Sequence, residues 1–125
     1  MAIYSAESNI TMSDELESYM PLTPVFYHIL LALFDGEKHG YGIMKTVEED
    51  TQGRMLIPLG TLYGSIKRML RADLIAETGE RPDPNSDDER RRYYQITGFG
   101  QQVLRAETQR LSRQVALAEA KRVLG

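Results

Sequence analysis

Residues 59–97 of the 125-residue chain read LGTLYGSIKRMLRADLIAETGERPDPNSDDERRRYYQIT. The first part of this stretch, 59–72, predicts an amphipathic helix, because apolar side chains recur at helical spacing. They are Leu62, Ile66, Met69 and Leu70. Residues 74–78 then predict a strand, 79–88 a loop rich in turn-forming residues, and 91–96 a returning strand. The stretch therefore predicts a helix followed by a hairpin with a long tip.

Two more helices are predicted before this stretch. Thr23 followed by Pro24 is a helix-start signal, since proline is favoured at the first helical position. The run 25–34 is almost wholly apolar, as expected of a buried helix, and residues 40–50 have the period of a half-exposed helix. Residues 55–58 predict a short extended piece, because a proline disfavours helix at the residue before it.

A long helix is predicted at the C-terminal end, capped by Thr97 and continuing to about residue 123. Residues 1–22 are expected to form an arm, or a short helix that starts at Ser13. The chain is thus mainly α with a small β-hairpin, in the order of a winged helix-turn-helix domain. We expect this domain to span residues 23–97 and to be followed by the long helix at 98–125.

Composition limits the class of protein. With 42% hydrophobic and 26% charged residues, the chain is typical of one globular domain. It has no cysteine, no apolar run long enough to cross a bilayer and no secretory signal pattern at its start, so we expect a cytoplasmic protein. The net charge of −3 argues against non-specific coating of nucleic acid, although basic residues gather in two short clusters.

The predicted helix 59–72 has an unusual solvent face. Thr61 and Tyr63 flank it, and its centre holds Gly60, Gly64, Lys67, Arg68 and Arg71. A helical glycine costs about 1 kcal/mol relative to alanine, so two of them one turn apart need a reason. One reason is close approach to the major groove of DNA, with the basic residues on phosphates. The alternative is that the first glycine eases the first turn and the second is merely tolerated.

Arg90, Arg91 and Arg92 begin the returning strand after the hairpin tip. Side chains alternate along a strand, so at least one of these arginines must point outward, where a hairpin tip can reach phosphate or the minor groove. The alternative is that they pair with the acidic residues 87–89. That acidic trio lacks the spacing of a calcium-binding loop, so we expect a solvated loop and no metal site.

The predicted C-terminal helix carries two apolar faces. One face, with Phe99, Val103 and Ala106, is expected to pack on the winged domain. The other is a heptad-like seam of Leu104, Leu111, Val115 and Ala118. A domain of this size cannot cover both faces, so we expect residues 98–125 to form a dimerisation helix in a homodimer. The alternative is packing of the seam on the chain's own N-terminal segment.

Three blocks of the sequence, by their order and spacing, resemble the PadR family of bacterial transcriptional regulators. The blocks are HGYGI at 39–43, GTLY at 60–63 and RRYYQIT at 91–97 with Gly100 after it, and the apolar pair at 74–75 also matches. Together they cover about residues 24–104. The chain resembles the short branch of the family, which has one C-terminal dimerisation helix.

The resemblance implies a homodimer whose third helix enters the major groove of a palindromic operator in double-stranded DNA, usually as a repressor. It also implies a small apolar or aromatic effector bound between the subunits near the seam, and no cofactor. The residues expected to contact DNA are Tyr41, Lys45, Gly60, Thr61, Tyr63, Gly64, Lys67, Arg68, Arg90, Arg91 and Arg92. The sequence departs from the family at Leu59 and Gly64, where proline is common, and at Asp73, where glycine is frequent.

Neither histidine suggests catalysis. His28 lies within an apolar run, and His39 lies just before a helix, whose start we expect it to order. No Ser/His/Asp set, phosphate-binding glycine loop or histidine-rich metal spacing is present in the sequence, so we expect no enzyme. The competing hypothesis is a winged helix used as a protein-interaction module. The salt dependence of binding distinguishes the two hypotheses, because binding through phosphate contacts weakens steeply as the salt concentration rises.

Overall fold

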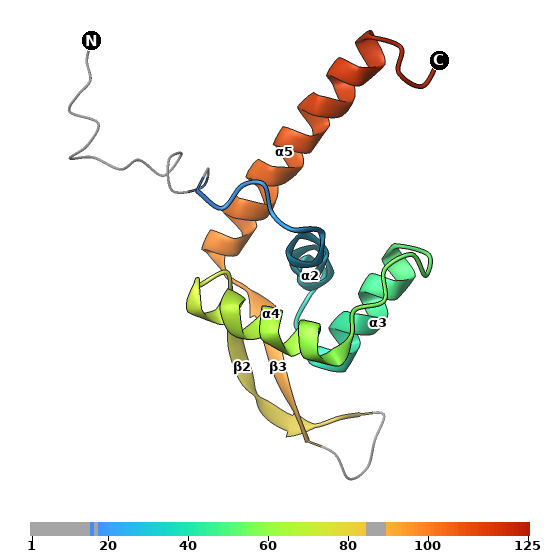
Figure 1. Ribbon diagram of the computed structural model, residues 1–125. Coiled ribbons are helices and arrows are strands. Elements are labelled where there is room, and N and C mark those ends of the chain that lie inside the picture. Colours follow the sequence, from blue (N-terminus) through green and yellow to red (C-terminus); the bar gives the residue numbers. More distant parts are fainter. Residues whose placement is uncertain (1–15, 17, 85–89) are drawn as a thin grey trace, which may run out of the picture.

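A computed structural model describes residues 16, 18–84 and 90–125 of the chain. Helices and strands follow in the order α2 (Pro24–Phe34), β1 (Lys38–His39), α3 (Gly40–Asp50), α4 (Leu59–Arg71), β2 (Ile75–Pro82), β3 (Arg90–Ile96) and α5 (Gly98–Ala120). Helix α2 lies at the centre beside α3 and α4, the β2–β3 hairpin projects at one end, and α5 extends away at the other (Figure 1). The predicted winged helix-turn-helix fold is confirmed. Most of the expected arm at 1–22 and the acidic trio at 87–89 lie outside the described residues.

Three helices begin with a side-chain cap where the sequence indicated a start. Thr23, His39 and Thr97 each accept a hydrogen bond from the amide three residues later, at 3.1, 3.0 and 2.9 Å. Such caps satisfy amides that have no partner within the helix. Helix α4 differs, because it begins after Pro58, which offers no side-chain cap.

Thr97 also joins the start of α5 to the end of α4. Its hydroxyl oxygen lies 2.6 Å from the Asp73 carbonyl oxygen, to which it donates. One turn into α5 the backbones come closer still: a Cβ at Gly100 would stand 2.1 Å from the Leu74 carbonyl oxygen. Only glycine permits this approach, so Gly100 fixes where α5 leaves the winged domain.

Strand β3 lies in the middle of a three-stranded antiparallel sheet with the order β1-β3-β2. The prediction of a loop from residue 79 is wrong, because β2 continues through a bulge to Pro82 and pairs there with Arg90. Gly79 has a φ of 141°, which glycine adopts at no steric cost. Pro82 ends an edge strand, where a missing N–H is tolerated. The hairpin is therefore longer and its tip shorter than expected.

Strand β1 was not predicted. Its two residues, Lys38 and His39, pair with Tyr94 and Tyr93 of β3. The Lys38 ammonium group also donates to the Ala32 carbonyl at 2.8 Å, which closes the C-terminal end of α2. Strand β1 therefore ties the start of α3 to the hairpin, so the two parts hold a fixed relative position.

The core is built from all the helices and from β2 and β3. Helix α2 contributes most, which explains its nearly uninterrupted apolar run. The core residues that are almost wholly buried are Ile29, Leu30, Ala32, Leu33, Ile43, Val47, Ile57, Leu62, Ile66, Met69, Leu74, Ile75, Tyr94, Val103 and Leu104.

Helix α5 is anchored at its middle by a buried carboxylate. Glu107 is 2% exposed and accepts hydrogen bonds from Arg110 at 2.6 and 2.8 Å and from the Leu22 amide at 3.1 Å. The hydrogen bonds from Arg110 hold the pKa of Glu107 below its usual value against the opposing effect of burial, and the Leu22 amide adds to them. This carboxylate therefore connects α5 to the segment that precedes α2.

Candidate nucleic-acid interface

The solvent face of α4 carries the residues that the sequence placed there. Thr61, Tyr63, Lys67 and Arg71 are exposed, and the opposite face holds the core positions. A Cβ at Gly60 would meet nothing within 4 Å, and one at Gly64 would meet only the end of a side chain at 3.6 Å. Packing within the chain therefore requires neither glycine, and any requirement for them must come from another molecule.

Arg68 is directed differently from the other basic residues of α4. Its guanidinium carbon lies 5.6 Å from the centre of the Phe26 ring on α2, and its Nη2 donates to the Ser65 hydroxyl at 3.4 Å. Arg68 therefore belongs to the edge of the α4 surface rather than to its centre, where the sequence placed it.

Tyr63 joins α4 to the start of α3. A Cβ at Gly40 would lie 2.6 Å from the Tyr63 hydroxyl oxygen and 2.9 Å from two ring carbons, so the ring rests directly on the glycine backbone. Tyr63 nevertheless remains 45% exposed. The phenol is thus held in one position by Gly40 and still presents its edge to solvent, a pairing that sequence spacing alone did not indicate.

The start of α3 presents a second aromatic side chain beside the first. Tyr41 is 45% exposed and stacks on the His39 ring, with ring centres 6.5 Å apart and an interplanar angle of 17°. The Arg91 guanidinium lies 5.8 Å from the Tyr41 ring centre. Lys45 follows one turn later on α3 and is exposed. The predicted residues of α3 and of the hairpin therefore meet on one surface.

The three hairpin arginines have different surroundings. Arg90 is exposed and reaches Glu80 on the neighbouring strand, with 4.0 Å between Nε and the carboxylate and 3.0 Å between Nη2 and the Glu80 carbonyl. Arg91 is half-buried and pairs with Asp83 at 3.3 Å. Arg92 is exposed and forms no ion pair within the described ranges. Arg92 is thus the arginine that is most available to a ligand.

Asp83 is a residue that sequence reasoning missed, because it fell in the expected loop. It is 7% exposed, and its Oδ2 lies 3.3 Å from Arg91 Nε and 3.7 Å from His39 Nε2. Burial lowers the pKa of His39, Asp83 partly opposes this effect, and Arg91 adds to it. A mainly neutral His39 can keep accepting the α3 cap hydrogen bond at Nδ1 and direct its Nε2–H toward Asp83. Asp83 therefore links the hairpin tip to the start of α3.

A hollow of about 270 Å³ opens between α4 and β3. All three hairpin arginines line it, together with His39, Gly40 and Tyr63. Among its lining residues Glu80 is the only carboxylate, and Arg90 faces it. Guanidinium groups and a phenol around a narrow opening form a surface that suits phosphate oxygens.

The predicted seam of α5 divides into two parts. Leu104 is only 4% exposed and belongs to the core of its own chain, which corrects its expected place at an interface. Leu111 and Ala118 are half-buried, and Val115 is 55% exposed. In Figure 1 the C-terminal half of α5 stands clear of the other described elements. Among the described residues, the apolar strip from Leu111 onward is therefore only partly covered.

The described ranges contain neither a metal-binding cluster nor a membrane-spanning helix. No three histidine, aspartate or glutamate side chains gather there in a way that could hold a metal ion. No helix among these residues has the length and apolar character needed to span a membrane.

Known proteins share both the sequence pattern and the fold. Residues 29–106 match the family described as the transcriptional regulator PadR-like family. A comparison with curated protein sequences finds no match. Among solved structures, a PadR family transcription regulator from Clostridium difficile is 25% identical, with a TM-score of 0.65 over 82% of this chain and 100% of that one.

Two further structures are similar in fold. A PadR-like transcriptional regulator from Bacillus cereus is 22% identical, with a TM-score of 0.64 over 81% of this chain and 92% of that one. Bacillus subtilis PadR in complex with operator DNA is 22% identical, with a TM-score of 0.58 over 69% of this chain. The match covers 47% of the Bacillus subtilis chain, about half of its length.

Proposed function

The chain belongs to the PadR-like family of transcriptional regulators, and from this membership we propose that it binds operator DNA sequence-specifically. It acts as a homodimer on a palindromic site, as a repressor, and without enzymatic activity. The observation that carries the proposal is the continuous surface formed by the solvent face of α4, the start of α3 and the hairpin arginines. We expect this function to be exercised in the cytoplasm.

In the proposed complex α4 lies in the major groove, which admits an α-helix. Gly60 and Gly64 leave the helix backbone open on this side, so it can approach the base edges closely. Lys67 and Arg71, one and two turns further along, then reach phosphates on the groove walls. The solved structure of Bacillus subtilis PadR in complex with operator DNA supports the proposal that a protein of this fold binds DNA.

The hairpin arginines and the two tyrosines supply the flanking contacts. Arg92 and Arg90 face the hollow beside α4, where a phosphate group fits between guanidinium groups. Tyr41 and Tyr63 are each 45% exposed, and each has a hydroxyl group that can donate a hydrogen bond. These contacts position the protein on the duplex, whereas α4 reads the sequence.

Dimerisation is proposed through the free strip of α5. Leu111, Val115 and Ala118 recur at helical spacing in the second half of α5. A second copy of the same helix covers such a strip in a symmetric dimer, the commonest form of assembly. Two α4 helices are then presented to two half-sites.

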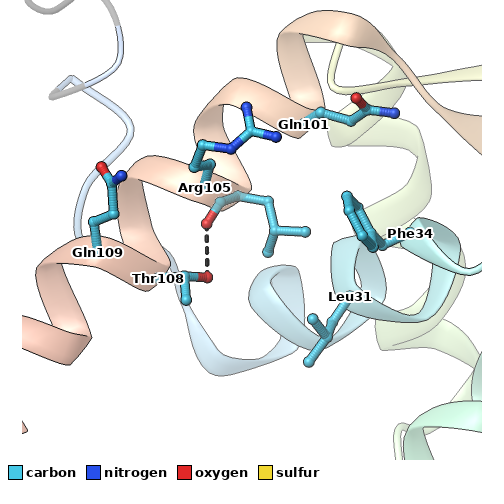
Figure 2. Close-up of a pocket in the computed structure, with 7 residues that line it drawn as sticks. Leu31, Phe34, Gln101, Arg105, Thr108 and Gln109 are labelled. Carbon is cyan, nitrogen blue, oxygen red and sulfur yellow. Dashed lines mark hydrogen bonds between the residues drawn. The ribbon is translucent and has the colours of Figure 1, made fainter.

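An effector site is proposed between α2 and α5. A pocket of about 240 Å³ lies there, lined by Leu31, Phe34, Leu104 and four polar or charged residues of α5. Figure 2 shows the two α2 side chains on one side of the pocket and Gln101, Arg105, Thr108 and Gln109 of α5 on the other. A small apolar or aromatic compound bound there touches both helices. It can shift the spacing of the reading helices only if it favours one dimer geometry.

Binding to the duplex from the chain's own upstream region tests the proposal. Fluorescence anisotropy should show tighter binding to this duplex than to a scrambled one of equal length, and the affinity should fall steeply with salt. Equal binding to both duplexes would reduce the claim to non-specific association. No binding at low salt would favour the alternative, a winged helix that contacts proteins through its exposed aromatic residues.

A further inference from the structure

Two large apolar side chains stand in solvent where α4 begins. Leu59 is the first residue of α4 and is 59% exposed, and Leu56, three residues earlier, is 65% exposed. A leucine exposed alone is common on protein surfaces and needs no explanation. These two, however, border the end of the helix that we propose enters the groove, where the N-terminal residues of such a helix meet base edges.

The first two turns of α4 offer little polar chemistry for reading bases. Residues 59–66 include no charged and no amide side chain. Arginine on guanine and asparagine or glutamine on adenine are the usual two-point contacts in the major groove, and none of these side chains is present in the two turns. Lys67 and Arg71 lie beyond them, and Arg68 lies against Phe26. Only Leu59, Thr61 and Tyr63 extend a side chain from the exposed surface of these turns.

Thymine is the base that such a surface can distinguish. In the major groove its C5 methyl group packs against apolar side chains, and no other base carries this group. Leu59 is the only one of these three exposed side chains that carries no polar atom, and a Cβ at its neighbour Gly60 would meet nothing within 4 Å. The backbone can therefore come close enough for the leucine to reach a methyl group.

We infer that Leu59 is a specificity-determining residue that contacts the C5 methyl group of a thymine in each operator half-site. The inference rests on the proposed function, since it requires α4 to enter the major groove. Sequence preference at this end of α4 then comes from apolar contact with thymine rather than from hydrogen bonds to guanine or adenine.

The test replaces thymine by 2′-deoxyuridine, which lacks only the methyl group. The operator is first obtained by selecting random duplexes with the full-length protein, and each thymine of a half-site is then replaced in both halves at once. For the wild-type protein, one replacement should weaken binding by about fourfold per methyl group, or about 15-fold for the two halves. For Leu59→Ala, overall affinity should fall, and the same replacement should change it by less than about twofold.

Two matched variants control the assignment. Leu56→Ala removes an equally exposed leucine that precedes the helix, and it should keep the wild-type response to uracil. Thr61→Ser removes the other exposed methyl group of the two turns. The inference is overturned if Leu59→Ala keeps the uracil response, whether or not Thr61→Ser loses it. Leu59→Ala should unfold at the same temperature as the wild-type protein, because the Leu59 side chain is mostly in solvent.

The outcomes also separate this inference from the proposed function. Selection that enriches no sequence would overturn the regulator proposal, and the thymine contact with it. Specific binding in which the uracil profiles of wild type and Leu59→Ala coincide would overturn the thymine contact alone.

Discussion

Four glycines, three at the proposed interface and one at the start of α5, differ in what an added methyl group would meet. At Gly60 and Gly64 it would meet open space or the end of a flexible side chain. At Gly40 it would meet the Tyr63 ring, and at Gly100 a backbone carbonyl. All four lie in helices that the sequence predicts, but only Gly100 meets the backbone of another segment and is required by the fold, whereas Gly40 is required by the position of the Tyr63 ring.

Gly64→Ala should separate folding from binding. Because alanine is the better helix former, the free energy of unfolding should stay equal or rise by about 1 kcal/mol, while operator affinity falls. Urea unfolding and anisotropy on the same preparation measure the two effects. Gly100→Ala is the matched control, and it should lose about 2–3 kcal/mol of stability because its methyl group overlaps the Leu74 carbonyl. Unfolding of Gly64→Ala would mean that this glycine packs inside.

His39 makes stability depend on pH. Burial, opposed by Asp83 and reinforced by Arg91, holds the pKa of His39 below its ordinary value of 6.5. The neutral form is favoured in the folded state, so its contribution to stability is complete above that value and is lost as pH falls toward the lowered pKa. Protonation at Nδ1 also removes the acceptor of the α3 cap hydrogen bond.

The free energy of unfolding should therefore decrease as the pH falls below 6.5 toward the lowered pKa of His39. The decrease should be smaller in His39→Asn, which keeps a good cap and does not titrate. Urea unfolding at each pH measures the slope. Glu107 also has a lowered pKa, but from an ordinary value of 4.5, so its contribution is lost only at lower pH and does not enter this range. Identical slopes for wild type and variant would contradict the role of His39.

Among the elements, the hairpin is held to the start of α3 more firmly than a free tip would be. Strand β1 pairs with β3, and Asp83 lies between Arg91 and His39. Thr78 and Arg81 on β2 both donate to Glu37, which directly precedes β1. Both strands of the hairpin are thus tied to the segment around β1, β2 through Glu37 and β3 through Asp83 and the pairing with β1. Its arginines divide into one that supports the structure and others that face outward.

Arg92→Ala should therefore affect DNA binding, whereas Arg91→Ala should affect the stability of the fold. Arg92→Ala should weaken binding to all duplexes alike and lower the slope of log affinity against log salt by about 1, with stability unchanged. Arg91→Ala should lower the free energy of unfolding by about 1–2 kcal/mol, because it removes the hydrogen bond to a buried carboxylate. Anisotropy at several salt concentrations and urea unfolding measure both. An unchanged slope for Arg92→Ala would remove Arg92 from the phosphate contacts.

Helical elements could be predicted from the sequence because each has a cap, a period or both. Strand β1 could not, since two residues have no period and its existence depends on pairing with β3, far away in the sequence. The end of β2 was hidden by Gly79 and Pro82, which signal a turn in most contexts but here form a bulge and an edge-strand end.

Individual positions of the candidate site were predictable only in part. A helical-wheel projection of the α4 sequence gives the exposed face correctly. It cannot show that the Arg68 side chain turns toward Phe26 on another helix. The α5 seam was derived from spacing alone, which does not reveal that Leu104 is buried in the core where α5 packs on α2, while Val115 further along is 55% exposed. In both places the deciding contact comes from a neighbouring element that local pattern does not specify.

At the scale of the whole molecule, the length of α5 has more influence on the geometry of the proposed dimer than its individual side chains have. Its first half packs on the body and is anchored through Glu107, while its second half extends beyond the body (Figure 1). In the proposed dimer, a rigid helix held in this way fixes the position of each α4 helix relative to the two-fold axis. Half-sites one helical turn apart, about 34 Å, tolerate little change in that distance.

Leu111→Glu should break the dimer, since a carboxylate in the seam of both helices is desolvated and meets its own copy across the axis. Each winged domain should remain folded, because Leu111 lies outside the buried core. Operator affinity should be lost with the dimer. Sedimentation velocity, circular dichroism and anisotropy measure these three properties.

Ala116→Glu introduces the same charge at an exposed position about 140° around α5, and it should remain a dimer that binds normally. If Leu111→Glu sediments as a dimer with wild-type affinity, the free strip of α5 is not the interface, and a regulation that acts through dimer geometry has no basis in this helix.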